Sequence, residues 1–214
     1  MNDQLIQKVI SEIEIPKFDT TKQYLNVFSI DFENGKPKIQ LIENDVYNEI
    51  DVVYVCIKNE PFFLAFSFSK DNSELIGTYT ENSNQIYFTA TSDSMTFKEL
   101  AEMTKLTNLK GWSFDQLRPN SKSKYGFTRI TYEPIENRAF DFGTKMNRLL
   151  TDLKSDAEGI IRIASLANAI VSIHHQMYIS GNKGIFLNNQ TIKTLNDLNL
   201  EVDIDQYVYG TEIK

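Results

Sequence analysis

One histidine and two aspartates near the C-terminus carry the side chains that acid–base chemistry or a divalent metal requires. His174 lies in a run of alternating apolar and polar residues, and Asp203 and Asp205 lie in a second run of this kind. Such alternation is typical of half-buried strands, and it puts all three side chains on a polar face. If the strands are neighbours, the three residues could form a small-molecule or metal site, even a hydrolytic one. The alternative is a solvated sheet face.

The remaining sequence contains no catalytic signature. His175 points to the face opposite His174, so the pair cannot share one metal, and we expect a buried, hydrogen-bonded imidazole. Cys56 is the single cysteine and reads as a small buried side chain. There is no nucleophile elbow, P-loop, HExxH motif or cysteine pair. We therefore expect a protein that is not an enzyme, with no catalytic residues, no metal and no cofactor.

Tyrosine is unusually frequent on the polar faces of these strands. Tyrosine is also enriched at the residues that dominate protein–protein binding. An aromatic sheet face seldom stays bare, so the alternatives are that the first domain or a second copy of the chain packs on it. The predicted binding surface consists of Tyr87, His174, Gln176, Tyr178, Asp203, Asp205, Tyr207 and Tyr209.

A basic stretch after residue 110 forms a second candidate site. Lys110, Arg118 and Arg129 could bind an anion, and Trp112 lies near them for stacking. A solvated charged loop is the alternative interpretation.

The strands that carry these residues alternate with helices. We expect strands at 86–91, 127–133, 168–179 and 201–209, and Thr96 to Glu99 fits a capping box that opens the first helix. Two further helices precede His174, and one more follows it. This order predicts a ferredoxin-like split βαβ domain with one extra helix, in which helices cover one face of a four-stranded antiparallel sheet.

The first part of the chain has a different pattern. An amphipathic helix is expected over 3–14, followed by strands at 24–32, 38–42, 50–57, 62–68 and 75–80, with a hairpin turn at Asn34-Gly35. The polar stretch 81–85 is the predicted boundary. The fold class is therefore α+β. An N-terminal helix plus antiparallel β-meander occupies 1–84, and the ferredoxin-like domain occupies 85–214.

Composition and charge limit the partners. The net charge is −7, and residues 1–84 hold 14 acidic and 7 basic residues, which accounts for the whole excess. Acidic character disfavours nucleic acid and suits a basic protein partner. No apolar run approaches the ~18 residues needed to span a membrane, and no secretion signal or disulfide pair is present. We expect a cytoplasmic protein without membrane contact.

Several segments of the second part resemble a known family. These are the strand ending at Ser92-Asp93-Ser94, the helix from Thr96, the segment Lys110-Gly111-Trp112, and the closing stretch from Leu200 to Val208. Residues 85–209 resemble an uncharacterised bacterial family, domain of unknown function 4279. The resemblance implies a small cytosolic domain, and some members lie near polymorphic-toxin loci, where an immunity role is suggested.

Together these observations favour one function over two others. We expect a non-enzymatic protein that binds another protein, as an immunity-type inhibitor of a bacterial toxin. The alternatives are the small-molecule or metal site at His174, Asp203 and Asp205, and a homodimeric structural module. The partner is then a protein or a second copy of the chain.

Overall fold

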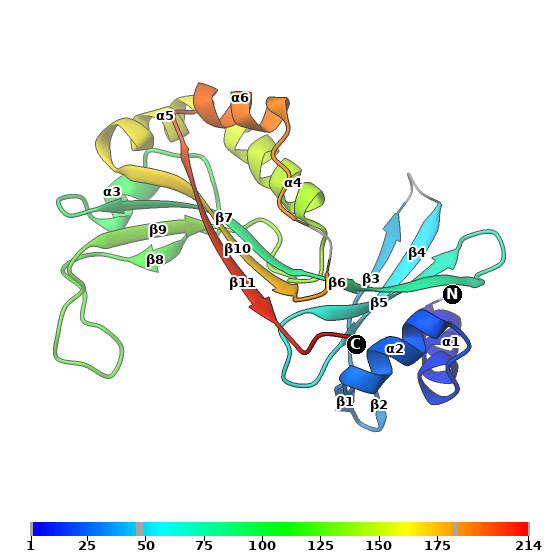
Figure 1. Ribbon diagram of the computed structural model, residues 1–214. Helices are drawn as coiled ribbons and strands as arrows, with labels where there is room; N and C mark the ends of the chain where they lie inside the picture. Colours follow the sequence, from blue (N-terminus) through cyan, green and yellow to red (C-terminus); the bar gives the residue numbers. More distant parts are fainter. Residues whose placement is uncertain (1, 46–48, 182–183, 214) are drawn as a thin grey trace.

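The protein is an α+β molecule with two main sheets lying side by side (Figure 1). The computed structural model describes residues 2–45, 49–181 and 184–213. The helices of the first part lie on one side of the molecule (Figure 1). Helices α4 (Phe142–Ser155), α5 (Ala157–Leu166) and α6 (Asn189–Asp197) lie on the other side. The uncovered face of the second sheet is therefore on the same side as α2.

The first part contains two helices and an antiparallel sheet in the order β3-β4-β5-β6. The predicted N-terminal helix is confirmed, and so are the four strands predicted between 38 and 80. The central strands β4 and β5 are nearly continuous apolar runs because both of their faces pack against other residues. The elements are α1 (Asn2–Glu14), α2 (Asp19–Val27), the hairpin β1 (Phe32–Glu33) and β2 (Lys36–Pro37), β3 (Ile39–Asp45), β4 (Ile50–Cys56), β5 (Phe63–Ser69) and β6 (Leu75–Glu81).

The prediction of a strand at 24–32 is wrong, because residues 24–27 belong to helix α2. Tyr24 and Phe28 are four residues apart, a spacing that fits one helix face as well as one strand face. Their rings stack with centroids 6.2 Å apart. The hairpin that follows is confirmed: Asn34 and Gly35 both have positive φ, at 53° and 76°, as a two-residue turn of this kind requires.

The second part contains a five-stranded sheet in the order β11-β10-β7-β9-β8. The prediction of four antiparallel strands needs two corrections. Lys110–Trp112 is a fifth strand, and β11 runs parallel to β10, with α6 as the crossover between them. The elements are β7 (Ser83–Ser92), α3 (Phe97–Ala101), β8 (Lys110–Trp112), β9 (Thr128–Tyr132), α4 (Phe142–Ser155), α5 (Ala157–Leu166), β10 (Asn168–Tyr178), α6 (Asn189–Asp197) and β11 (Glu201–Tyr209).

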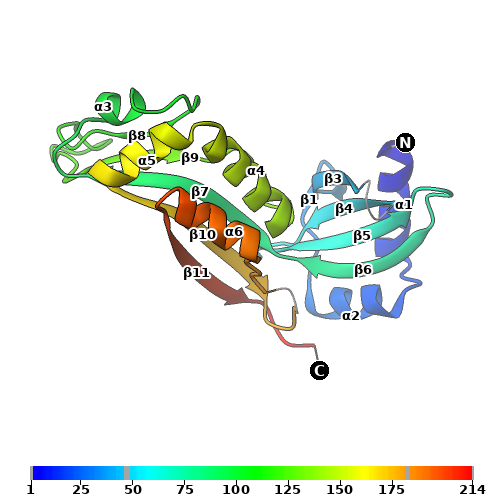
Figure 2. The same cartoon turned by 90° about the horizontal axis from the view of Figure 1, so that it is seen from above.

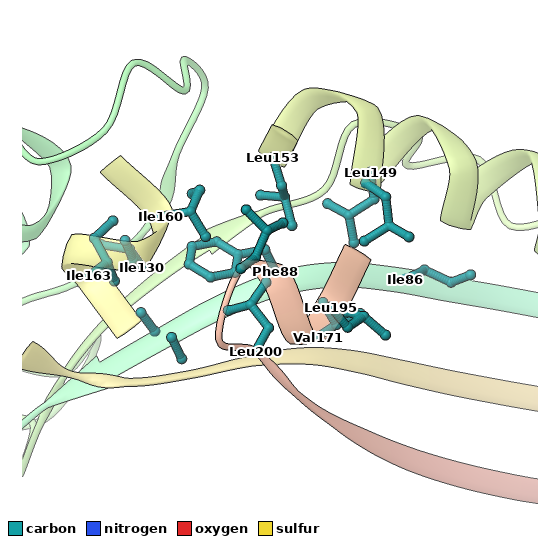
Figure 3. Packing of buried hydrophobic residues seen from close by; sticks show 14 of the residues in the cluster. Ile86, Phe88, Ile130, Leu149, Leu153, Ile160, Ile163, Val171, Leu195 and Leu200 are labelled. Carbon is teal, nitrogen blue, oxygen red and sulfur yellow. The ribbon is translucent and has the colours of Figure 1, made fainter. Parts of the chain in front are cut away.

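Helices α4, α5 and α6 cover one face of this sheet (Figure 2). Phe88 and Val171 point from the sheet toward Leu149 and Leu153 of α4, and all four are fully buried (Figure 3). Burial of such side chains stabilises the fold by about 1.5–3 kcal/mol each. The capping box is confirmed, since Thr96 accepts a hydrogen bond from the Glu99 amide and the Glu99 carboxylate accepts one from the Thr96 amide. The helices leave the opposite face of the sheet uncovered.

The two parts share one aromatic core. Tyr178, the last residue of β10, is 1% exposed and packs into the core of the first part. Its ring centroid lies 4.9 Å from that of Phe28 and 5.2 Å from that of Phe62. Its hydroxyl donates a 2.6 Å hydrogen bond to the carbonyl of Thr211. The end of the chain is thereby fastened against the first part.

A buried lysine lies near the junction of the two parts. Lys145 is 1% exposed, and its ammonium donates to the carbonyls of Asn84 and Asn137 at 2.6 and 2.9 Å. Burial lowers the pKa of Lys145 from 10.5 to about 8, although the nearby carboxylate of Glu133 opposes this. Between these pH values the unfolded chain holds a proton that the folded protein has lost.

This difference predicts a pH-dependent stability. Because unfolding takes up a proton in this window, the free energy of unfolding should rise as the pH is raised from 8 toward 10. In Lys145→Met this contribution is absent. The free energy of unfolding of the wild type, minus that of the variant, should therefore rise by at most about 1.4 kcal/mol per pH unit. Chemical denaturation at several pH values measures it. Lys154→Met, on the exposed side of α4, is the control, and equal slopes for all three proteins would contradict the assignment.

The open face and its cleft

The candidate site is the open face, which we define as the surface of the five-stranded sheet opposite α4, α5 and α6. The strand registers decide which side chains meet there. His174 of β10 lies between Gln85 of β7 and Asp205 of β11. The condition set from the sequence is met, because the histidine strand and the final strand are neighbours. The two strands lie side by side in the sheet, and α4, α5 and α6 lie together on one side of that sheet (Figure 1).

His174 is held between two partners. Its Nε2 lies 2.9 Å from the Tyr87 hydroxyl and 3.7 Å from the Asp205 carboxylate. The His174 and Tyr87 rings stack with centroids 5.6 Å apart. A neutral His174 can accept a hydrogen bond from the Tyr87 hydroxyl, and a protonated His174 can form an ion pair with Asp205. Stacking and hydrogen bonding together fix the orientation of the imidazole.

Arg129 of β9 continues the contacts from Tyr87. Its guanidinium donates to the Tyr87 hydroxyl at 3.2 Å and to the Thr89 hydroxyl at 3.1 Å. The guanidinium carbon lies 5.6 Å from the Tyr87 ring centre and 5.8 Å from that of Trp112. Both distances suit a cation–π interaction. Arg129 therefore lies between two aromatic rings and is hydrogen-bonded to side chains of β7.

The contacts end in the long loop between β8 and β9. Trp112 stacks on Tyr125, with ring centroids 4.6 Å apart and ring planes 18° apart. Arg118 lies over the Tyr125 ring, with its guanidinium carbon 5.6 Å from the ring centre. One connected row thus crosses all five strands, acidic at β11 and basic at the loop. We call it the polar-aromatic row; it consists of Asp205, His174, Tyr87, Arg129, Trp112, Tyr125 and Arg118.

Not every predicted surface residue lies on the open face. Tyr178 does not contribute, because its ring completes the first core. Tyr209 is half-buried against that core, and Gln176 donates to its hydroxyl at 3.4 Å. Asp203 and Tyr207 are exposed on β11. Lys110 is bonded to Glu136 and does not join the row.

The histidines and the acidic residues can also be placed. His175 is buried, with its ring nitrogens next to Asn82 and Asn84 at 3.2 and 2.7 Å, so the prediction of a hydrogen-bonded core imidazole is confirmed. Within 2–45, 49–181 and 184–213, no group of three or more His, Cys, Asp or Glu side chains could hold a metal. Among the residues that the structure describes, His174 and Asp205 thus meet as a pair and not as part of such a group.

A cleft of about 430 Å³ opens at the end of the open face nearest the first part. Its volume falls in the usual range for small-ligand pockets, about 300–1,000 Å³. The wall from the first part is apolar, with Pro61 and Phe63, and carries the carboxylate of Glu60. The remaining lining is polar and consists of Ser83, Gln85, Arg138, His174 and Gln176.

Arg138 and Glu133, beside the cleft, form a long ion pair that leaves hydrogen-bonding groups of both residues unused. Arg138 approaches Glu133 only to 3.7 Å, and the Glu133 Oε1 atom is buried without a hydrogen bond. The other Glu133 oxygen accepts from Gln85 at 2.9 Å. Arg138 therefore has donors left for an acceptor that enters the cleft.

Sequence reasoning missed both the cleft and Tyr125. The only local signal for Tyr125 is an aromatic residue within a basic loop close to Trp112. No local signal exists for the cleft, because its lining comes from four segments that only the packing of the two sheets brings together. The row and the cleft share His174, so they form one continuous candidate surface.

The fold and the site define a class: an α+β protein with one helix-covered sheet face and one face lined by linked polar and aromatic side chains. Residues 78–209 match the family described as "Domain of unknown function (DUF4279)", and the chain belongs to this family. No curated protein and no solved structure matches the chain. Among the described residues, no helix has the length and apolarity that a bilayer crossing needs.

Proposed function

We propose that this protein binds another protein through the open face and is not an enzyme. The polar-aromatic row carries the proposal, because its rings and charged groups are held in place by one another. Side chains that are already ordered lose little conformational entropy when a partner binds. Tyrosine, tryptophan and arginine are also the residues that contribute most to protein–protein affinity. A binding role fits this arrangement better than hydrolysis, since His174 already has two partners.

The cleft gives this surface an anchor point. A partner side chain with an acceptor at its tip would pack its apolar stem on Pro61 and Phe63 and reach Arg138 or His174. Charge favours a partner with a basic segment beside Asp203 and Asp205, because these carboxylates make the β11 end of the open face acidic and the acidic excess of the chain lies in residues 1–84. The same charge argues against nucleic acid.

We place this binding role in the cytoplasm, as an immunity-type inhibitor of a bacterial toxin. The support is the family membership together with a surface suited to occluding another protein. For the fold, we propose that β10, β7, β9 and β8 form the ferredoxin-like split βαβ unit, to which α6 and β11 are added. The antiparallel strand order of these four agrees with that arrangement.

The test uses the product of the neighbouring gene as the candidate partner. Trp112 is the single tryptophan and lies in the row, so its emission reports binding directly. Tyr207→Ala should weaken binding by about tenfold or more, as expected for an exposed aromatic contact worth at least about 1.4 kcal/mol. Phe32→Ala is the matched control, because Phe32 is a similarly exposed aromatic residue outside the open face. Absence of binding by the wild type, or equal losses in both variants, would contradict the proposal.

A further inference from the structure

Strand β11 is a long sheet edge with little of the usual protection. Edge strands are normally short, bulged, covered, or marked by lysine or proline, because their free backbone groups can pair with another chain. Edge strand β8 has three residues, β3 contains a register shift between Ile39 and Leu41, and β6 packs against α2. By contrast, β11 has nine residues and an unbroken register with β10, and it contains no lysine, arginine or proline. Its charged residues are the carboxylates Glu201, Asp203 and Asp205, which belong to the odd-numbered set, so none of them lies among Val202, Ile204, Gln206 and Val208.

The backbone of β11 presents alternate residues to the free edge. The amide of Ile179 donates to the carbonyl of Tyr209 at 2.9 Å, so the odd-numbered residues of β11 are turned toward β10. In a strand, the neighbouring residues must then point their N–H and C=O groups the other way. These outward residues are Val202, Ile204, Gln206 and Val208.

Apolar side chains are exposed along this same edge. Ile204 is 43% and Val208 55% exposed on the helix side, and Tyr207 is 45% exposed on the open face. Helix α6 is the outermost of the covering helices on the β11 side of the sheet (Figure 2). It carries Ile192, also 53% exposed. An edge with free backbone groups and exposed apolar residues suits pairing with another strand.

We propose that β11 pairs antiparallel with β11 of a second copy of this chain, about a two-fold axis through Gln206. This register places Ile204 opposite Val208 of the second copy, and Asp205 opposite Tyr207 of the second copy. The strand is thus self-complementary, with an apolar pair on one face and a carboxylate–hydroxyl pair on the other. The outward N–H and C=O of Gln206 meet their own counterparts, as the backbone orientation requires.

Neighbouring registers are worse. An axis through Asp205 would place two like charges directly opposite each other, which destabilises a strand pair. Gly210 has a φ of +85° and leaves the extended conformation, so pairing must stop before it. An axis through Tyr207 would place Ile204 opposite Gly210 and limit pairing to residues 205–209, whereas the axis through Gln206 allows pairing over 203–209. Pairing through Gln206 joins the two five-stranded sheets into one and doubles the open face.

Light scattering over a range of concentrations tests the dimer. The wild type should pass from 24.7 kDa toward twice this mass as concentration rises. Val208→Lys should raise the dimer dissociation constant by about a hundredfold, because two-fold symmetry places a lysine twice at the edge. Ile76→Lys, at a 52% exposed position on β6, should leave it unchanged. A wild type that stays monomeric throughout, or equal effects of both variants, would overturn the proposal.

The register has its own test. In a Cys56→Ser background, Gln206→Cys should be linked to its copy by a short bis-maleimide, whereas Glu201→Cys should not, because it lies far from the axis. Linkage of both, or of Glu201→Cys alone, would refute this register. The outcome is separable from partner binding, since Val208 faces the helix side. A Val208→Lys monomer that still binds the neighbouring gene product leaves the open-face proposal intact.

Discussion

Replacing Tyr178 with alanine should lower the free energy of unfolding by about 3–5 kcal/mol, the usual cost of deleting a buried aromatic ring. The Tyr178 ring is 1% exposed and makes edge and tilted contacts with Phe28 and Phe62. The ring reaches the core of the first part from β10, so it joins the two sheets. The variant should therefore also loosen the contact between the two sheets.

Tyr178→Phe separates the ring from its hydroxyl. The phenylalanine keeps the packing and loses only the hydrogen bond to Thr211, so its cost should be about 1 kcal/mol. Chemical denaturation followed by circular dichroism measures both variants. If alanine and phenylalanine cost the same, the ring would not be what holds the first core together.

Gly111→Ala should detach β8 from the sheet and disrupt the polar-aromatic row. A Cβ atom at Gly111 would lie 1.8 Å from the carbonyl oxygen of Arg129, and the φ of +148° is itself unfavourable for other residues. Because the clash is with backbone, no side-chain rotation can relieve it. We expect a loss of roughly 3 kcal/mol and release of Trp112 from Tyr125, which shifts its emission to longer wavelength.

Gly126→Ala is the matched control in the same connection. A Cβ atom there has no neighbour within 4 Å, so stability and emission should stay as in the wild type. The fluorescence is unambiguous because the protein has a single tryptophan. An unshifted Gly111→Ala spectrum would mean that β8 does not hold Trp112 in the row.

Local patterns predicted most of the second part. Alternation placed β7, β9, β10 and β11, and it put His174 and Asp205 on the same side of the sheet. Pattern alone does not determine strand direction, so the parallel pairing of β10 and β11 escaped it. The strand β8 was missed because three residues are too few to show a period. The alternation put Tyr178 on the same face as His174. Tyr178 is the last residue of β10, however, and its ring packs into the core of the first part instead of lying on the open face.

The first part shows a different limit. The spacing of Tyr24 and Phe28 fits either a helix or a strand, and tertiary packing of α2 decided it. The cleft was beyond reach for another reason. Its residues are ordinary turn, strand and loop positions, and only the side-by-side placement of the two sheets brings Pro61 and Phe63 close to His174.

The shared aromatic core has a consequence for how the polypeptide is made. Translation delivers the first sheet long before it delivers Tyr178 and Ile213, which complete its packing. While the ribosome is still elongating, Phe28 and Phe62 lack the ring that later covers them. The amino-terminal half must then wait, incompletely packed, and nascent-chain proteolysis should find it cleavable until the final β-strand has emerged.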